Sequence, residues 1–306
     1  MGFALPDRFI WDFWTIEHGG LCWLYALTAP RHHDPDTRHN AARVDLMTSR
    51  DLMSWDYRGP VLEPGSTGAW DDLAIWTGSV AACPDGGFAM LYTGRCRAEE
   101  GRVQRIGLAR SDDLITWRKR SQPVIEADPK LCRLKGARGS TNWRDPWLEW
   151  DSGRTLWRAW ITAQHPDGPV ETSGTIALAE SPDLVSWTVR PPVIADRLCE
   201  HLEVPQLLAG GHGMLVNTYG HFVPENSSLP RKCMSLLFRD EGSGFEFDRI
   251  VESWPSDARY ILKQVRPGVG LCWLGEQSNG RFLGEISDPF DFDPLGASRT
   301  GERLRG

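Results

Sequence analysis

The sequence lacks an excess of basic charge and any long apolar run. Its 34 Lys and Arg residues are outnumbered by 41 Asp and Glu residues, so the formal net charge is −7. A protein that follows a nucleic-acid backbone needs a basic face, and we therefore expect no nucleic-acid partner. No apolar run approaches the length of a transmembrane helix, so we expect no membrane insertion.

The sequence has no closely paired cysteines, and we expect no signal peptide. The seven cysteines form no Cys-x-x-Cys pair, which favours buried free thiols in a reducing compartment. Asp7 and Arg8 stand where a signal peptide needs an apolar core. The stretch from His32 to His39 is a polar loop, which we interpret as solvated or as the rim of a binding site. We thus predict a cytoplasmic protein with no metal and no cofactor.

One seven-residue motif, Ser-x-Asp-Leu-x-x-Trp, is repeated. It occupies 49–55, 111–117 and 181–187, with a degenerate copy at 287–292 and an eroded one around 238–245. The Ser and Asp side chains are expected to bond nearby backbone donors and hold a turn. The Leu and Trp side chains are expected to enter the core.

Short strand-like runs lie between the copies, and no long helical periodicity is present. Units of about 60 residues with four short strands each are typical of propeller blades. Five such units fill the 306 residues. We therefore predict an all-β fold, a single five-bladed β-propeller over residues 1–306 with four antiparallel strands per blade. A β-sandwich with coincidental repeats is the alternative.

The innermost strands of a propeller ring a central channel, so their polar side chains meet there. We expect these strands at 9–14, 73–79, 142–147, 202–207 and 259–263, and three of them carry an acid: Asp12, Asp145 and Glu203. A carboxylate in an apolar strand is costly unless it is used or paired. Glycoside cleavage needs a nucleophile, a protonated acid and a group that holds hydroxyls.

Four segments of these strands resemble motifs of the fructosyl-active glycoside hydrolase families 32 and 68. The first is similar to the Trp-Asp-x-Trp nucleophile segment of family 68, and the second to Trp-Ser-Gly-Ser of both families. The third matches Arg-Asp-Pro, and the fourth is similar to the acid/base segment. In chain order they are Trp11-Asp12-Phe13-Trp14, Trp76-Thr77-Gly78-Ser79, Arg144-Asp145-Pro146 and Glu203-Val204-Pro205.

The resemblance implies a retaining glycoside hydrolase or transglycosylase that acts on a small carbohydrate, a β-fructofuranoside such as sucrose or fructan. Asp12 would be the nucleophile, Glu203 the general acid/base and Asp145 the transition-state stabiliser. The residues predicted to bind substrate are Trp11, Trp14, Trp76, Ser79, Arg144, His201 and Tyr260.

The chain departs from both families. It lacks the Asn-Asp-Pro-Asn of family 32, Val204 replaces an arginine of family 68, and no C-terminal β-sandwich fits its length. We therefore expect a divergent member. Two alternatives are an inverting arabinofuranosidase or arabinanase of family 43 type, whose first Asp serves as a base, and a catalytically silent sugar-binding propeller.

Each candidate residue also has a structural interpretation. Asp12 is then a cap between two tryptophans, and Asp145 pairs with Arg144. Trp14 and Trp76 belong to the core in this interpretation.

Overall fold

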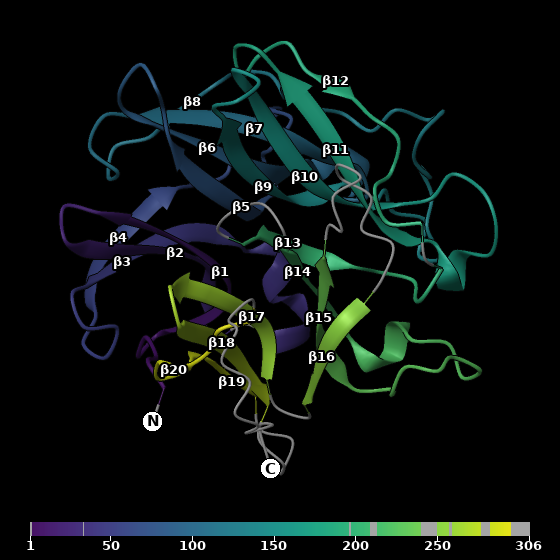
Figure 1. Ribbon diagram of the computed structural model, residues 1–306. Coiled ribbons are helices and arrows are strands. Elements are labelled where there is room, and N and C mark those ends of the chain that lie inside the picture. The colour runs from purple at the N-terminus through teal and green to yellow at the C-terminus, as the bar shows by residue number, and fades with distance from the viewer. Residues whose placement is uncertain are drawn as a thin grey trace.

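Five four-stranded antiparallel sheets follow one another around a central axis in the computed structural model (Figure 1). The structure describes residues 2–32, 34–195, 197–208, 213–239, 250–256, 259–276 and 282–294. The prediction of an all-β, five-bladed propeller is confirmed. None of the helices in these residues is long and apolar enough to cross a membrane.

The strands divide into blades in chain order. Blade I contains β1 (Arg8–His18), β2 (Leu21–Pro30), β3 (Arg43–Ser49) and β4 (Asp56–Leu62). Blade II contains β5 (Ala74–Ala82), β6 (Phe88–Arg95), β7 (Gln104–Ser111) and β8 (Arg118–Lys119). Blade III contains β9 (Arg144–Asp151), β10 (Leu156–Gln164), β11 (Gly174–Ser181) and β12 (Thr188–Val189). Blade IV contains β13 (Glu203–Leu207), β14 (Gly213–Thr218), β15 (Cys233–Arg239) and β16 (Ile250–Ser256). Blade V contains β17 (Arg259–Arg266), β18 (Val269–Glu276), β19 (Phe282–Ile286) and β20 (Phe290–Asp291).

Four short 3-10 helices occupy the loops between the second and third strands of blades I to IV. They are η1 (Pro35–Asn40), η2 (Arg97–Glu99), η3 (Val170–Thr172) and η4 (Gly220–Phe222). Their shared position places them on one edge of the propeller. Two of them, η1 and η4, contribute side chains to the central cavity described below.

The repeated motif forms the turn between the third and fourth strands of blades I to III, as predicted. In the first copy, the Ser49 hydroxyl accepts the Leu52 N–H at 2.8 Å, and the Asp51 carboxylate accepts the N–H groups of Met53 and Ser54. Leu52 has a φ of 63° and a buried side chain. The second copy repeats these bonds, and in the third the Asp183 carboxylate again accepts two backbone N–H groups while the Ser181 hydroxyl accepts the Asp183 N–H. Leu114 and Leu184 are likewise buried with positive φ. The eroded copy runs past Arg239 and lies outside the described residues.

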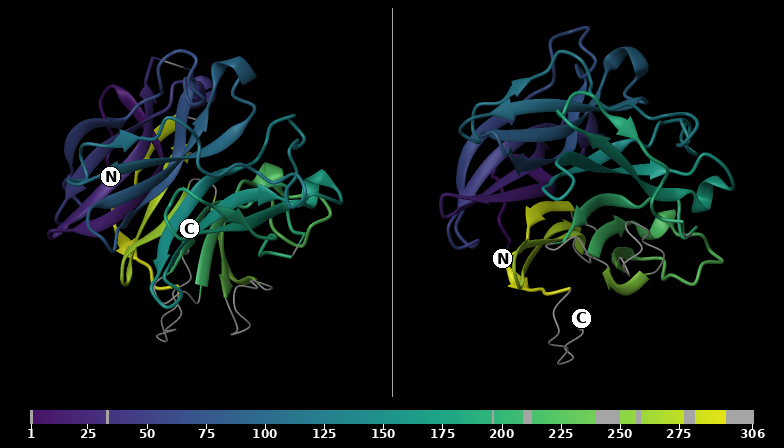
Figure 2. Two further views of the ribbon diagram at one scale, coloured as in Figure 1. Left: turned by 90° about the horizontal axis from the view of Figure 1, so that it is seen from above. Right: turned by 45° about the horizontal axis from the view of Figure 1, so that its top comes forward.

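The apolar core lies between consecutive blades. One cluster joins blades V, I and II, a second joins II and III, a third III and IV, and a fourth IV and V. Each sheet is therefore buried on both faces by its neighbours, which arranges the blades around the axis (Figure 2). The ring closes where Phe3 pairs with Ile286 of β19 through two backbone hydrogen bonds of 2.7 and 2.9 Å.

Candidate active site

All five innermost strands have an irregular hydrogen-bond register near their N-terminal ends. The pairing of each with the second strand of its blade shifts by an extra residue, which is the signature of a β-bulge. A bulge breaks the alternation of side chains, so two consecutive residues can both face the axis. The shifts fall after Ile10 in β1, Trp76 in β5, Arg144 in β9, Glu203 in β13 and Tyr260 in β17.

The bulges in three strands require a left-handed backbone. Asp145, Val204 and Ile261 have φ values of 55°, 51° and 55°. Such a conformation is strained for residues with a branched side chain, and strain of this kind concentrates at functional sites. Because of the bulges, pairs of consecutive residues line the central cavity, such as Trp11 with Asp12 and Arg144 with Asp145.

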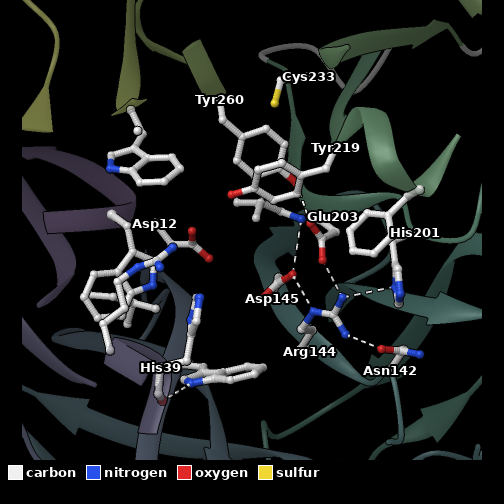
Figure 3. A pocket seen from close by; sticks show the side chains of 18 of the residues that line it. Asp12, His39, Asn142, Arg144, Asp145, His201, Glu203, Tyr219, Cys233 and Tyr260 are labelled. Atoms are coloured by element: carbon white, nitrogen blue, oxygen red, sulfur yellow. Dashed lines mark hydrogen bonds and ion pairs between the residues drawn. The ribbon is translucent and has the colours of Figure 1, made fainter. Parts of the chain in front are cut away.

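A cavity of about 790 Å³ opens at the axis and receives eight of the ten predicted site residues (Figure 3). This volume is typical of small-molecule sites. The three carboxylates come from β1, β9 and β13, so three different blades bring them together. The eight residues in the lining are Trp11, Asp12, Trp76, Arg144, Asp145, His201, Glu203 and Tyr260.

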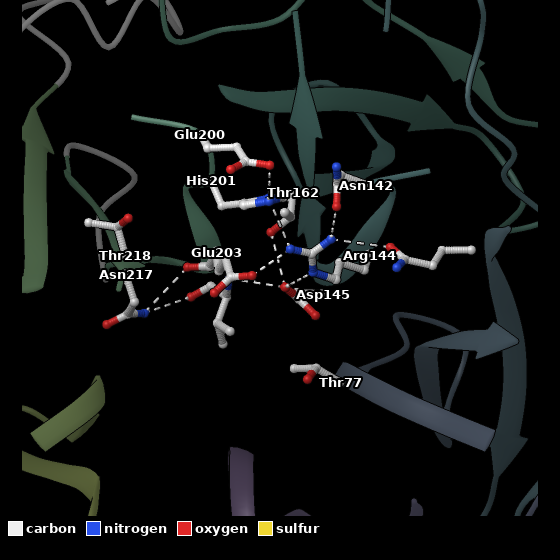
Figure 4. A network of polar contacts seen from close by, with 12 residues as sticks. Thr77, Asn142, Arg144, Asp145, Thr162, Glu200, His201, Glu203, Asn217 and Thr218 are labelled. Atoms are coloured by element: carbon white, nitrogen blue, oxygen red, sulfur yellow. Dashed lines mark hydrogen bonds and ion pairs between the residues drawn. The ribbon is translucent and has the colours of Figure 1, made fainter. Parts of the chain in front are cut away.

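Arg144 joins two of the carboxylates (Figure 4). Its Nη2 donates a hydrogen bond to Glu203 Oε1, and its Nε lies 3.5 Å from Asp145 Oδ2. Its Nη1 donates to Asn142 Oδ1 at 2.7 Å. The guanidinium is buried, and burying a charge is tolerated when it is paired and hydrogen-bonded in this way. Arg144 therefore fixes the separation of blades III and IV at the cavity.

The imidazole of His201 contacts the guanidinium of Arg144. Its Nδ1 lies 3.2 Å from Arg144 Nη2, and its Nε2 lies 3.2 Å from Glu200 Oε1. Burial lowers the pKa of His201, so the ring is neutral. The network then assigns the tautomer: Nε2–H donates to Glu200, and Nδ1 accepts from Arg144. His201 lies in the cavity wall, but both of its nitrogens are engaged by protein.

Asp12 is held by the neighbouring blade. The hydroxyl of Thr77 on β5 donates a hydrogen bond to Asp12 Oδ2. Burial raises the pKa of Asp12 to about 6, and the charge of Glu203 adds to the increase. Arg38 acts in the opposite direction. Asp12 therefore changes from neutral to ionised close to neutral pH, where a catalytic carboxyl is most useful.

Asp145 receives three donors at one oxygen. Thr162 Oγ1 lies 3.2 Å from Asp145 Oδ2, and the Val204 N–H lies 3.4 Å away, beside the Arg144 contact. Burial raises the pKa of Asp145 to about 7 despite these donors, and the charges of Asp12 and Glu203 contribute. Burial, with added repulsion among the three acids, therefore keeps a proton in the cavity at neutral pH.

Glu203 behaves differently from the two aspartates. Burial is the largest influence and would raise its pKa, but the charge of Arg144, His201 and the hydrogen bonds from Tyr260 and Arg144 together outweigh burial. The pKa of Glu203 therefore lies below its ordinary value. Tyr260 donates its hydroxyl to Glu203 Oε2, so both carboxylate oxygens have a protein donor.

Trp14 and Ser79 were expected in the sugar pocket, but neither lines it. Trp14 is 2% exposed and stacks on Tyr25 at 6.1 Å, inside the core of blade I. The Ser79 hydroxyl donates to Pro146 O and accepts the Leu148 N–H, each at 2.7 Å. Both residues lie beyond the bulges of their strands, where side chains turn away from the cavity. Ser79 instead fixes β9 against β5.

Sequence reasoning missed several residues of the cavity wall. η1 contributes Arg38 and His39, and β6 contributes Arg95, whose guanidinium lies 4.0 Å from the centre of the Trp76 ring. The polar loop from His32 to His39 had been interpreted as solvated or as a rim. The described part of that loop supports the second interpretation, because η1 lies at the cavity.

Lys263 is a further buried group next to the site. Its Nζ donates to Val204 O at 3.1 Å and Pro205 O at 3.2 Å, which holds the bulge that follows Glu203. Burial lowers the pKa of Lys263 to about 7, while the charges of Asp145 and Asp12 oppose that decrease. A lysine in the expected fifth inner strand was a usable signal, by the same reasoning that identified the acids.

The described residues contain no group of three or more His, Cys, Asp or Glu side chains placed to hold a metal ion. The cavity wall carries carboxylates, a guanidinium, imidazoles and a phenol. Three carboxyl groups with different proton affinities are suited to acid–base and nucleophilic catalysis at an acetal carbon.

The chain matches a family model described as the N-terminal domain of glycosyl hydrolases family 32, over residues 32–218. It is 33% identical over 165 residues to a fructan 6-exohydrolase from Triticum aestivum, which covers 52% of this chain and 26% of that protein. It is 32% identical over 145 residues to a cell-wall β-fructofuranosidase from Zea mays, covering 46% and 22%. The aligned part thus spans about a quarter of the length of these relatives.

Solved structures share the fold over nearly the whole chain. The inulosucrase of Halalkalicoccus jeotgali bound to kestose superimposes with a TM-score of 0.71 at 21% identity, covering 91% of this chain and 79% of that one. The levansucrase of Gluconacetobacter diazotrophicus gives 0.72 at 16% identity, covering 94% and 79%.

Proposed function

Because the chain belongs to the family defined by the glycosyl hydrolases family 32 N-terminal domain, we propose that it is a glycoside hydrolase or transglycosylase that acts on β-fructofuranosides. One observation carries the proposal. Asp12, Asp145 and Glu203 come from three blades and line a single cavity, and Arg144 bridges the last two. The relatives named fructan 6-exohydrolase and β-fructofuranosidase support the furanoside as substrate.

The proposed reaction retains the anomeric configuration. Glu203 donates a proton to the glycosidic oxygen while a carboxylate oxygen of Asp12 attacks the anomeric carbon, so the bond to the leaving group breaks as the bond to Asp12 forms. Glu203 then takes a proton from water, or from a sugar hydroxyl, which displaces Asp12 from the anomeric carbon. Asp145 accepts hydrogen bonds from ring hydroxyls and stabilises the positive charge of the transition state.

The resting protonation pattern is the reverse of the one this reaction needs. The pKa values place the proton on the aspartates, and Glu203 is ionised against Arg144. Because the acids repel one another, ionisation of Asp12 raises the affinity of Glu203 for a proton. Sugar hydroxyls that donate to Asp12 and Asp145 favour that ionisation. Substrate binding is thus the step that moves the proton to Glu203.

Two tryptophans support sugar binding. Trp11 and Trp76 line the cavity, and aromatic faces stack on the apolar faces of sugar rings. The Nε1–H of Trp11 is buried out of contact with solvent, so this indole offers a ligand its ring and not its N–H.

A product screen tests the proposal. The protein is incubated with sucrose, inulin, levan and arabinofuranosides, and the released sugar and its anomer are followed by NMR. Release of fructose with retention is the expected result. Release of arabinose with inversion would instead support the arabinan-cleaving alternative. Sugar binding without any released product would identify a silent binding propeller.

A further inference from the structure

The backbone of η1 is fixed at the cavity by donors from blade II. Trp76 Nε1 donates to the His39 carbonyl at 2.7 Å, and Arg95 Nη1 donates to the same carbonyl at 3.3 Å. Arg95 Nη1 also lies 3.0 Å from Asn40 Oδ1. These bonds set the position of His39 before any ligand arrives, so its side chain is preorganised.

The imidazole of His39 is held between two tryptophans. Its ring centre lies 5.6 Å from that of Trp11 and 5.6 Å from that of Trp76, edge-on to both. Figure 3 shows the ring extending into the cavity on the side of Asp12. Within the described part of the chain, neither ring nitrogen has a hydrogen-bond partner, although the carbonyl of the same residue has two.

The ring of His39 is neutral near neutral pH. Burial lowers the pKa of His39 to about 3, and the cations Arg38 and Arg95 lower it further. A neutral imidazole has one N–H donor and one nitrogen acceptor. A sugar hydroxyl can either donate to the unprotonated nitrogen or accept from the N–H, so it can bond to the imidazole at either position.

We propose that His39 binds a ring hydroxyl of the furanose that occupies the cavity beside Asp12. This inference rests on the proposed function, because it takes the furanoside as the ligand. Trp11 and Trp76 contact the imidazole edge-on, and the hydrogen bonds from the Trp76 and Arg95 side chains to the His39 carbonyl fix the position of the residue in the cavity wall. His39 is thereby a specificity-determining contact supplied by the loop between the first blade's second and third strands.

Binding of 2,5-anhydro-D-mannitol, a furanose that cannot be hydrolysed, tests this role by isothermal titration calorimetry. We expect His39→Ala to weaken binding about 10-fold, the effect of about one good hydrogen bond. His39→Gln keeps a neutral donor and acceptor and should recover part of the affinity. His18→Ala, at the exposed outer end of β1, is the matched control and should bind as the wild type does.

Monodeoxy derivatives of the same ligand identify the hydroxyl. One derivative should bind equally to the wild type and to His39→Ala, since both have lost the same hydrogen bond. The proposal would be overturned if His39→Ala weakened the binding of every derivative by the same factor, or if His39→Ala bound the parent ligand with wild-type affinity. Cleavage by the wild type with unchanged binding in His39→Ala refutes only the role of His39. Binding that depends on His39 without cleavage of any furanoside refutes only the proposed function.

Discussion

The phenol of Tyr260 on β17 donates a hydrogen bond to Glu203 on β13, so blade V acts directly on a carboxylate that blade IV carries. This donor is one of the groups that keep the pKa of Glu203 low. Together with Arg144 it occupies both oxygens of the proposed acid/base. The proton affinity of Glu203 is therefore set by residues from two other blades.

Removing this phenol should shift the acidic side of the pH profile. Because the resting proton lies on the aspartates, Glu203 has the lower pKa and sets the acidic limb of kcat/KM. In Tyr260→Phe the pKa of Glu203 rises, so this limb is expected to move upward, measured with the best substrate of the product screen. Tyr57→Phe is the control, because the Tyr57 hydroxyl bonds Asp45 on β3 and should leave the limb in place. A downward shift would contradict the donor role of Tyr260.

Asp12 should determine the alkaline side of the same profile. The competent form has an ionised Asp12 and a protonated Glu203, and the proton that these two acids share is lost as pH rises through the Asp12 pKa of about 6. We expect kcat/KM to fall as pH rises above about 6, with a slope of one proton. An alkaline limb near pH 4 would show instead that Asp12 ionises as it does in water.

Leaving-group chemistry should separate the two proposed roles. Glu203→Gln removes the proton donor, which typically contributes about 10²- to 10⁴-fold to the rate. An aryl furanoside with a good leaving group needs little protonation, so its first step should survive in Glu203→Gln. Asp12→Asn should lose activity on both the natural and the aryl furanoside, because no nucleophile remains. Glu225→Gln, at an exposed position, is the control. Rescue of Asp12→Asn by the aryl substrate would reverse the assignment.

Replacing Asp12 should stabilise the fold at alkaline pH. The folded-state pKa of Asp12 is raised to about 6 from 3.8, so the wild type loses stability as pH rises through that window. Asp12→Asn removes this loss, which we estimate at about 3 kcal/mol. We expect a higher Tm for the variant at pH 8 and a smaller difference at pH 4, by differential scanning calorimetry. A variant that is less stable at pH 8 would contradict this.

The sequence alone determined the blades. The motif repeats at 49–55, 111–117 and 181–187 place the same turn between the same two strands, because each copy holds its own backbone through short-range hydrogen bonds. The repeats also set the period of the blades, which located the inner strands and, within them, the acids Asp12, Asp145 and Glu203. A carboxylate in an apolar strand is expensive wherever the strand lies.

Only the tertiary structure decided which neighbours of those acids face the cavity. Trp14 and Ser79 lie on the same strands as site residues, but the bulges turn them away, and a bulge depends on pairing with a second strand. His39 could not be chosen from its loop, because its position depends on Trp76 and Arg95 of the next blade. The proton affinities depend on contacts between blades, as the bonds of Arg144 and Tyr260 to Glu203 show. Such contacts are long-range in sequence, so no local pattern encodes them.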